Sequence, residues 1–247
     1  MTTLKAFHND PAIKTKYLAR LTAHVKADEL IHGKGWENGK GCAVGCTLDK
    51  YDHAAYETEL GIPESLARLE DTLFEGQPNG TSKTFPVRFL QAIPVGADLS
   101  LVTPRFIHWL LIDPTHGVIR FANTEPCRDA INGVAVMYAG WIKTKKKPAA
   151  WAAARAAAWA SGAAGAAAWA SNAAYSVYRS AYSAARAAYS AAWSAASVYS
   201  VYSVYSVYSV YRADEADEAA NAANAAARDA HYEVMAEKLI TLLQETA

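Results

Sequence analysis

The chain has 247 residues, and its 24 lysine and arginine residues balance 24 aspartate and glutamate residues, so the formal net charge is zero. A dedicated nucleic-acid-binding protein is not expected, because such proteins depend on an excess of positive charge. No stretch of about 18 residues lacks a polar break and the N-terminus has no apolar signal segment, so we expect neither a membrane span nor Sec export. Three cysteines do not make a disulfide framework, and a reducing cytoplasm fits them best.

The composition changes abruptly near residue 148, where a short run of lysines gives way to a tract rich in Ala, Ser, Tyr and Trp. Residues 1–147 have the mixed composition of a globular domain, whereas strong helix formers dominate the region that follows. We therefore predict two domains: a helical globular domain with a Gly-rich site over 1–147, and a helical repeat region over 148–247. The predicted fold class is all-α, and the Ala-rich region is expected to form a helical bundle or hairpin.

The first predicted helix begins at Asp10, a good N-cap residue, followed by Pro11, which suits the first helical turn. Apolar residues near helical spacing extend this helix as far as Gly33. A Gly-rich stretch then runs from Gly33 to Cys46. This stretch contains most of the residues that we consider below as a binding site.

Further helices are predicted downstream of the Gly-rich stretch. The segment 63–76 begins with Pro63 and ends with Gly76, and its leucines line one face. The spacing of Glu64, Arg68, Asp71 and Glu75 predicts a charge-laced helix face, and the paired acids Glu70 and Asp71 are predicted to be solvated rather than catalytic. Helices are also predicted over 86–93, 105–113 and 125–142.

A seven-residue repeat begins at Tyr175 and places Tyr182 and Tyr189 at equivalent positions. On an alanine background this period predicts a helix whose aromatic seam packs against a partner helix. The triplet SVY then occurs five times over 197–211, either as a purposeful tyrosine array or as a product of replication slippage. A last amphipathic helix, over roughly 214–245, is expected to dock on the core.

His24, Asp28 and His32 stand four residues apart, so one helical face would carry all three. The glycines that follow permit close backbone approach, and successive N–H groups leading into a helix form an anion cradle to which Lys40 adds charge. The block is not a phosphate-binding P-loop, because position 34 is Lys and position 41 is Gly. The residues predicted to bind a small anionic ligand are His24, Asp28, His32, Gly39, Lys40, Gly41, Cys42, Cys46 and His53.

Three other interpretations of this block stay open. Cys42 and Cys46, flanked by His32 and His53, could bind zinc, but a second close ligand pair is missing, and we predict no metal and no cofactor. A cysteine at a helix N-terminus beside His24 or His53 could act as a nucleophile, although no third, orienting residue identifies itself. Finally, the cysteines could be small core residues beneath a tight turn.

Three stretches together resemble an uncharacterised family of phage and prophage proteins: GWENGKGCAVGCTL at 35–48, YDHAAYETELGIPESLARLEDTLFEG at 51–76 and FLQAIPVGADLSLV at 89–102. The likeness covers most of 1–142 and includes an Ala/Tyr/Trp-rich helical tail. The tail alone is similar in composition to the Ala-rich helices of proposed immunity proteins from bacterial toxin systems. The resemblance implies a setting, the cytoplasm of a bacterial host cell, and no mechanism.

Within that setting we predict a non-enzymatic phage-type accessory protein that counteracts host defence. It would act by binding or sequestering a small anionic, nucleotide-like ligand or a host defence protein. Two alternatives remain. The first is a cysteine- or metal-dependent enzyme that uses the residues of the same block. The second is a structural or assembly protein that forms a homo-oligomer through its aromatic helical tract.

Overall fold

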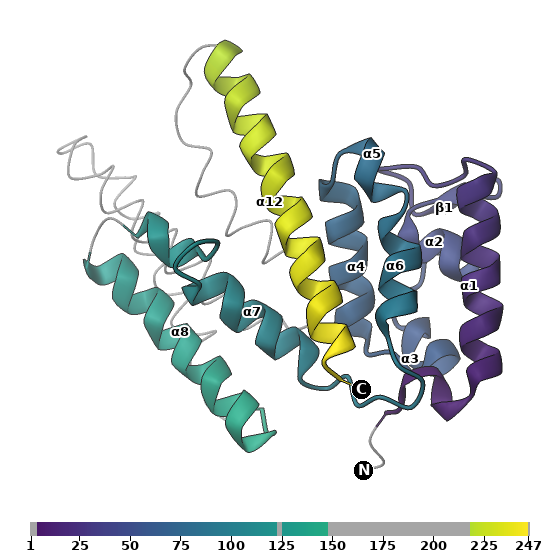
Figure 1. Cartoon of the computed structure of the whole chain (residues 1–247), viewed down its shortest axis with the longest axis horizontal. Helices are drawn as coiled ribbons and strands as arrows, with labels where there is room; N and C mark the ends of the chain where they lie inside the picture. The colour runs from purple at the N-terminus through teal and green to yellow at the C-terminus, as the bar shows by residue number, and fades with distance from the viewer. Residues whose placement is uncertain (1–3, 123–124, 148–217, 247) are drawn as a thin grey trace, which may run out of the picture. The chain divides into compact units, whose positions relative to one another are not determined.

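The computed structural model describes residues 4–122, 125–147 and 218–246 (Figure 1). Over these residues the fold is all-α, as predicted, with one small two-stranded sheet. The chain divides into two compact units, the first formed by Met1–Thr103 with Ala216–Ala247 and the second by Pro104–Glu215. The predicted Ala-rich bundle or hairpin, the aromatic seam and the SVY repeats lie outside the described residues, and the predicted boundary at residue 147 stays a prediction.

The first unit begins with a short 3-10 helix, η1 (Ala6–Asn9), followed by α1 (Pro11–Lys26). The Asp10 side chain accepts a hydrogen bond from the backbone N–H of Ala12 at 2.8 Å, which confirms the predicted N-cap. The predicted end of this helix is wrong. It ends at Lys26, because Asp28 adopts a left-handed backbone conformation with φ 56°, which stops helical propagation.

The Gly-rich stretch forms a small β-hairpin, in which β1 (Trp36–Glu37) pairs antiparallel with β2 (Lys40–Gly41). The two turn residues, Asn38 and Gly39, both have positive φ, at 52° and 79°. Two consecutive residues with positive φ between paired antiparallel strands form a type I′ turn, which is the hairpin turn that Asn-Gly favours most. No strand is predicted here from the hydrophobic pattern, although the Asn-Gly pair favours a hairpin.

A helical core follows the hairpin, built from α2 (Ala43–Leu48), α3 (Ala55–Leu60), α4 (Glu64–Gly76), α5 (Asn79–Ser82) and α6 (Phe85–Ala92). The helix α4 is central, because α2, α3, α5, α6 and the C-terminal helix α12 (Glu218–Gln244) all pack against it. Figure 1 shows α12 beside α4 and α6, which confirms that the last helix docks on the core. Its buried face is apolar and consists of Tyr232, Met235, Ala236, Leu239, Ile240, Leu242 and Leu243.

The second unit contains most of α7 (Val102–Ile112), the 3-10 helix η2 (Val118–Phe121) and α8 (Glu125–Thr144). These bounds confirm the helices predicted over 105–113 and 125–142. Aromatic rings contact one another inside this unit, for example Tyr138 stacked on Trp141 at 6.2 Å between centroids. In the part of the chain that the structure describes, no helix is both long and apolar enough to span a membrane.

Candidate functional site

His24, Asp28 and His32 do not share a helical face, so that prediction is wrong. The reason is the early end of α1 at Lys26, which puts Asp28 and His32 in the loop beyond it. The Asp28 carboxylate forms an ion pair with Lys83 at the surface. The His32 ring packs edge-on against Phe74 at 4.7 Å, and its Nε2 is buried without a hydrogen-bond partner among the described residues.

His24 remains on α1 and lies between two carboxylates. Its Nδ1 is 2.6 Å from Glu29 Oε2, and its Nε2 is 3.1 Å from Asp49 Oδ1. Asp49 also forms an ion pair with Arg20 at 3.1 Å. This network joins the end of α1 to the loop after it and to the end of α2, which makes His24 a structural link between these three segments.

Three glycines of the block, Gly35, Gly41 and Gly45, permit close packing, whereas Gly33 and Gly39 have positive φ and open space where a Cβ would stand. A Cβ added at Gly45 would lie 1.9 Å from the carbonyl oxygen of Gly35, and a Cβ at Gly41 would lie 2.3 Å from the same atom. A Cβ at Gly35 would lie 2.5 Å from the ring of Tyr51. Since no side chain fits at any of these positions, the hairpin can rest directly on the start of α2. Lys40 is exposed on β2, at the edge of this packing.

Cys42, directly before α2, and Cys46, within α2, are both buried, with exposed fractions of 1% and 0%. Burial raises the pKa of Cys42, with a further contribution from the nearby Asp71, and burial raises the pKa of Cys46 to about 12. Cys46 Sγ lies 3.4 Å from the carbonyl oxygen of Gly41, to which it donates. A thiol that stays protonated is a poor nucleophile, so the arrangement fits the core interpretation of these cysteines better than the nucleophile interpretation.

The helix α4 carries three acids toward its neighbours, contrary to the prediction of a solvated face. Glu70 is 0% exposed and Asp71 8%, and Glu75 follows one turn after Asp71. The prediction failed because helices surround α4 on several sides, so that side chains beyond its leucine stripe are also buried. Arg68 and Glu64 do form the expected surface ion pair, with 2.6 Å between Nη2 and Oε1.

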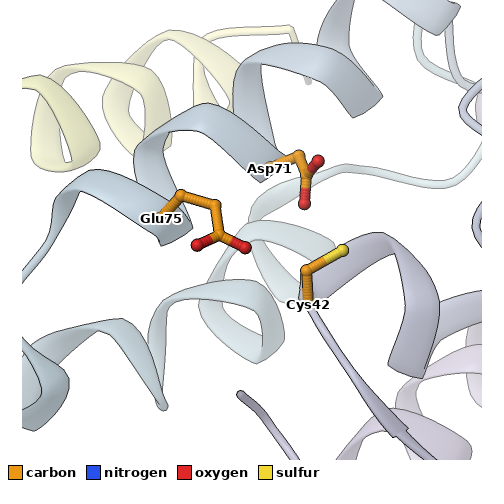
Figure 2. Close-up of side chains that lie close together, drawn as sticks. All are labelled: Cys42, Asp71 and Glu75. Carbon is orange, nitrogen blue, oxygen red and sulfur yellow. The ribbon is translucent and has the colours of Figure 1, made fainter. Parts of the chain in front are cut away.

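Three of these side chains converge. A ligand atom from each of Cys42, Asp71 and Glu75 lies within 4.8 Å of the other two. Figure 2 shows the two carboxylates on successive turns of α4, with the Cys42 sulfur, at the start of α2, directed toward them. We call these three residues the thiol–carboxylate cluster.

The surrounding groups hold Asp71 and Glu75 in different ways. Asp71 Oδ2 lies 3.0 Å from His53 Nε2 and accepts a hydrogen bond from the Tyr51 hydroxyl at 3.2 Å. Asp71 Oδ1 is buried and has no hydrogen-bond partner among the described residues. Glu75 Oε2 accepts a hydrogen bond from the backbone N–H of Gly33 at 2.7 Å. Within the cluster the Cys42 thiol is the neighbouring donor to the Asp71 carboxyl group, and Asp71 Oδ1 has no partner at full hydrogen-bond geometry among the described residues.

The thiol–carboxylate cluster and the neighbouring Glu70 bring several acidic groups together with few positive charges beside them. Among the described residues, His53 is the basic side chain that contacts Asp71, and no lysine or arginine forms an ion pair with Glu70, Asp71 or Glu75. Burial raises the pKa of Glu75 to about 7, with the Asp71 charge adding to the effect and the Gly33 N–H opposing it. Burial also raises the pKa of Glu70 far above its usual range, while the Tyr56 hydroxyl donates to Glu70 Oε2 at 2.8 Å.

A divalent cation fits this donor set. Carboxylate oxygens and a cysteine sulfur are both zinc ligands, and a bound metal ion deprotonates a coordinating thiol. Small side-chain movements would bring the three atoms to the roughly 3.5 Å spacing of donors around a tetrahedral zinc ion. An anion is disfavoured at the same place, because two carboxylates would repel it and the Gly33 N–H is already occupied.

Cys42 and His53 were predicted as site residues from the sequence, whereas Asp71, Glu75 and Tyr51 were not. The available signal was the i, i+4 spacing of Asp71 and Glu75, which puts two carboxylates on one helical face. That spacing is equally typical of exposed helices, so it does not by itself indicate a site. No protein-family model, curated protein or solved structure matches this chain.

Proposed function

We propose that this protein binds a divalent transition metal, Zn²⁺ in the first instance, through Cys42, Asp71 and Glu75. The observation that carries the proposal is the buried Asp71 Oδ1, which lacks a hydrogen-bond partner among the described residues and belongs to a cluster with a thiol and a second carboxylate. Leaving a buried charged oxygen unsatisfied is costly, and a bound cation removes that cost. The thiol favours zinc over magnesium or calcium, which prefer ligand sets made of oxygen alone.

Two neighbouring side chains would act from outside the ligand set. His53 and Tyr51 both bond Asp71 Oδ2, so they fix the carboxylate and leave Oδ1 for the metal. Such outer partners orient a ligand and raise its affinity for the ion. The Gly33 N–H holds Glu75 from the side of the loop in the same way.

The resemblance of residues 1–142 to phage and prophage proteins supports an accessory role in an infected bacterial cell. We therefore include in the proposal that the protein acts by binding rather than by catalysis. Capture of a metal ion replaces the anionic ligand that the sequence suggested. Capture of a host defence protein stays a further possibility that this site does not address.

The test is zinc titration of the metal-free protein against a chromophoric chelator. We expect one equivalent of Zn²⁺ to bind, and we expect Cys42→Ser and Glu75→Gln each to weaken binding at least about 10-fold. Cys46→Ser is the matched control, because Cys46 is equally buried but lies outside the cluster. It should leave the affinity within about twofold of the wild type.

Cobalt gives a second readout of the same site. Co²⁺ bound to a thiolate has a charge-transfer band in the near ultraviolet, and this band should appear in the wild type and in Cys46→Ser but not in Cys42→Ser. Melting curves of the metal-free variants establish that each one is folded. The proposal is wrong if the wild type binds no metal, or if Cys42→Ser binds it as tightly as the wild type does.

A further inference from the structure

The last turn of α4 is held by the C-terminal helix. The ring of Tyr232, on α12, lies directly on the backbone of Gly76, where an added Cβ would be 2.0 Å from Tyr232 Cε1 and 2.3 Å from Cζ. Tyr232 is 2% exposed, so its ring is enclosed at this contact. Only glycine leaves room for a flat ring this close to the helix backbone.

This contact is adjacent to one of the proposed metal ligands. Gly76 is the last residue of α4 and follows Glu75 directly, whereas Asp71 lies one full turn earlier. The final turn of a helix is its least stable part, because its carbonyl groups lack intrahelical partners. The position of Glu75 therefore depends on contacts from outside the helix, and the described contacts are the Gly33 N–H on one side and the Tyr232 ring at the next residue.

We propose that Tyr232 is a positioning residue of the metal site: its ring, packed on Gly76, fixes the last turn of α4 and with it the Glu75 carboxylate. This inference rests on the proposed function. It assigns to α12 a role beyond completing the core. The zinc affinity of a site built from residues 42, 71 and 75 then depends on a residue that lies 157 positions after Glu75 in the chain. The site is complete only while α12 is docked.

The test compares zinc affinity with stability in the full-length protein. Tyr232→Ala should weaken zinc binding about 10-fold, measured well below the melting temperature, whereas Tyr232→Phe should bind as the wild type does because the ring itself makes the contact. Leu243→Ala is the control, since Leu243 is fully buried on the same helix and its loss also destabilises the protein. It should leave zinc affinity within about twofold of the wild type.

Two further variants keep the test decisive if Tyr232→Ala does not fold. Tyr232→Leu retains an apolar side chain without the flat ring, and Gly76→Ala displaces the ring from the other side; both should weaken zinc binding. If the wild type binds zinc and Tyr232→Ala or Tyr232→Leu loses no more affinity than Leu243→Ala, the positioning role is wrong and the metal site stands. If the wild type binds no zinc, both proposals fall.

Discussion

The carboxylate of Glu75 accepts a hydrogen bond from the backbone N–H of Gly33, with 2.7 Å between the two atoms. The Gly-rich loop therefore bonds an anion that belongs to the chain itself. This relationship joins the loop after α1 to the last turn of α4, and it leaves Glu75 next to Asp71 and Cys42. It also changes what the loop can bind, because a backbone donor that would serve an external anion is already used.

The first prediction concerns the pH dependence of stability. The folded-state pKa of Glu75 is raised from 4.5 to about 7, so the folded protein holds this proton over a range in which the unfolded chain has released it. The carboxyl group's contribution to stability is complete below about pH 4.5 and is lost as the pH rises to about 7. In the metal-free protein, Glu75→Gln should flatten the fall of melting temperature over this interval. An unchanged slope in this variant would show that Glu75 is not the group responsible.

Glu70 should give a pH dependence of the same sign as Glu75. Its folded-state pKa lies well above the usual range because the carboxyl is fully buried, so its contribution to stability is complete below the pKa of the unfolded chain and is lost as the pH rises through the raised folded-state pKa. One such group contributes a slope of up to about 1.4 kcal/mol per pH unit. Glu70→Gln should remove this share of the slope, as followed by urea unfolding at several pH values. Tyr56→Phe should cost about 1–2 kcal/mol at neutral pH, because it leaves Glu70 Oε2 without its donor.

Gly45→Ala tests the close packing of the hairpin on α2. The added Cβ would lie 1.9 Å from the backbone oxygen of Gly35, which cannot move away without breaking the hairpin. We expect a loss of about 3 kcal/mol or more in the free energy of unfolding, at the upper end of the cost of overpacking. Gly80→Ala is the control, since no atom lies within 4 Å of its added Cβ. A small effect at both positions would contradict the packing described here.

The two buried thiols should be unreactive in the folded, metal-free protein. A Cys127→Ser background leaves Cys42 and Cys46 as the cysteines of the chain. Both are buried and both have raised pKa values, so an aromatic disulfide reagent should label neither faster than the protein unfolds. In denaturant, two equivalents should react at once. Rapid labelling of one thiol under native conditions would instead support the nucleophile interpretation of that cysteine.

The C-terminal helix should be indispensable to the first unit. Leu239 is fully buried, and α12 packs against both α4 and α6. Leu239→Ala should therefore cost about 2–5 kcal/mol, as measured by chemical denaturation. The exposed ion pair between Arg88 and Glu237, at 2.7 Å, is a useful comparison on the same helix, because Glu237→Gln should cost less than about 1 kcal/mol. Equal costs for the two changes would show that α12 does not complete the core.

Local signals in the sequence determined most of the helices. Asp10 and Pro11 mark the start of α1 because capping and a fixed proline φ act within one turn of chain. Pro63 and Gly76 bound α4 for similar reasons, and the leucines between them define one buried face. The Asn38–Gly39 turn is also a local feature that the sequence indicates, because it requires only two adjacent residues that accept positive φ.

The candidate site was decided by the tertiary structure. Whether Glu70 and Asp71 face water or the interior depends on how many helices surround α4. The spacing of apolar residues along α4 does not indicate how many helices pack against it. The thiol–carboxylate cluster likewise joins Cys42 to residues 29 and 33 positions away, through packing between α2 and α4. Helix formation depends on a few neighbouring residues, so it can be predicted locally. The thiol–carboxylate cluster depends instead on which helix faces contact one another, and that is decided by the packing of the whole core.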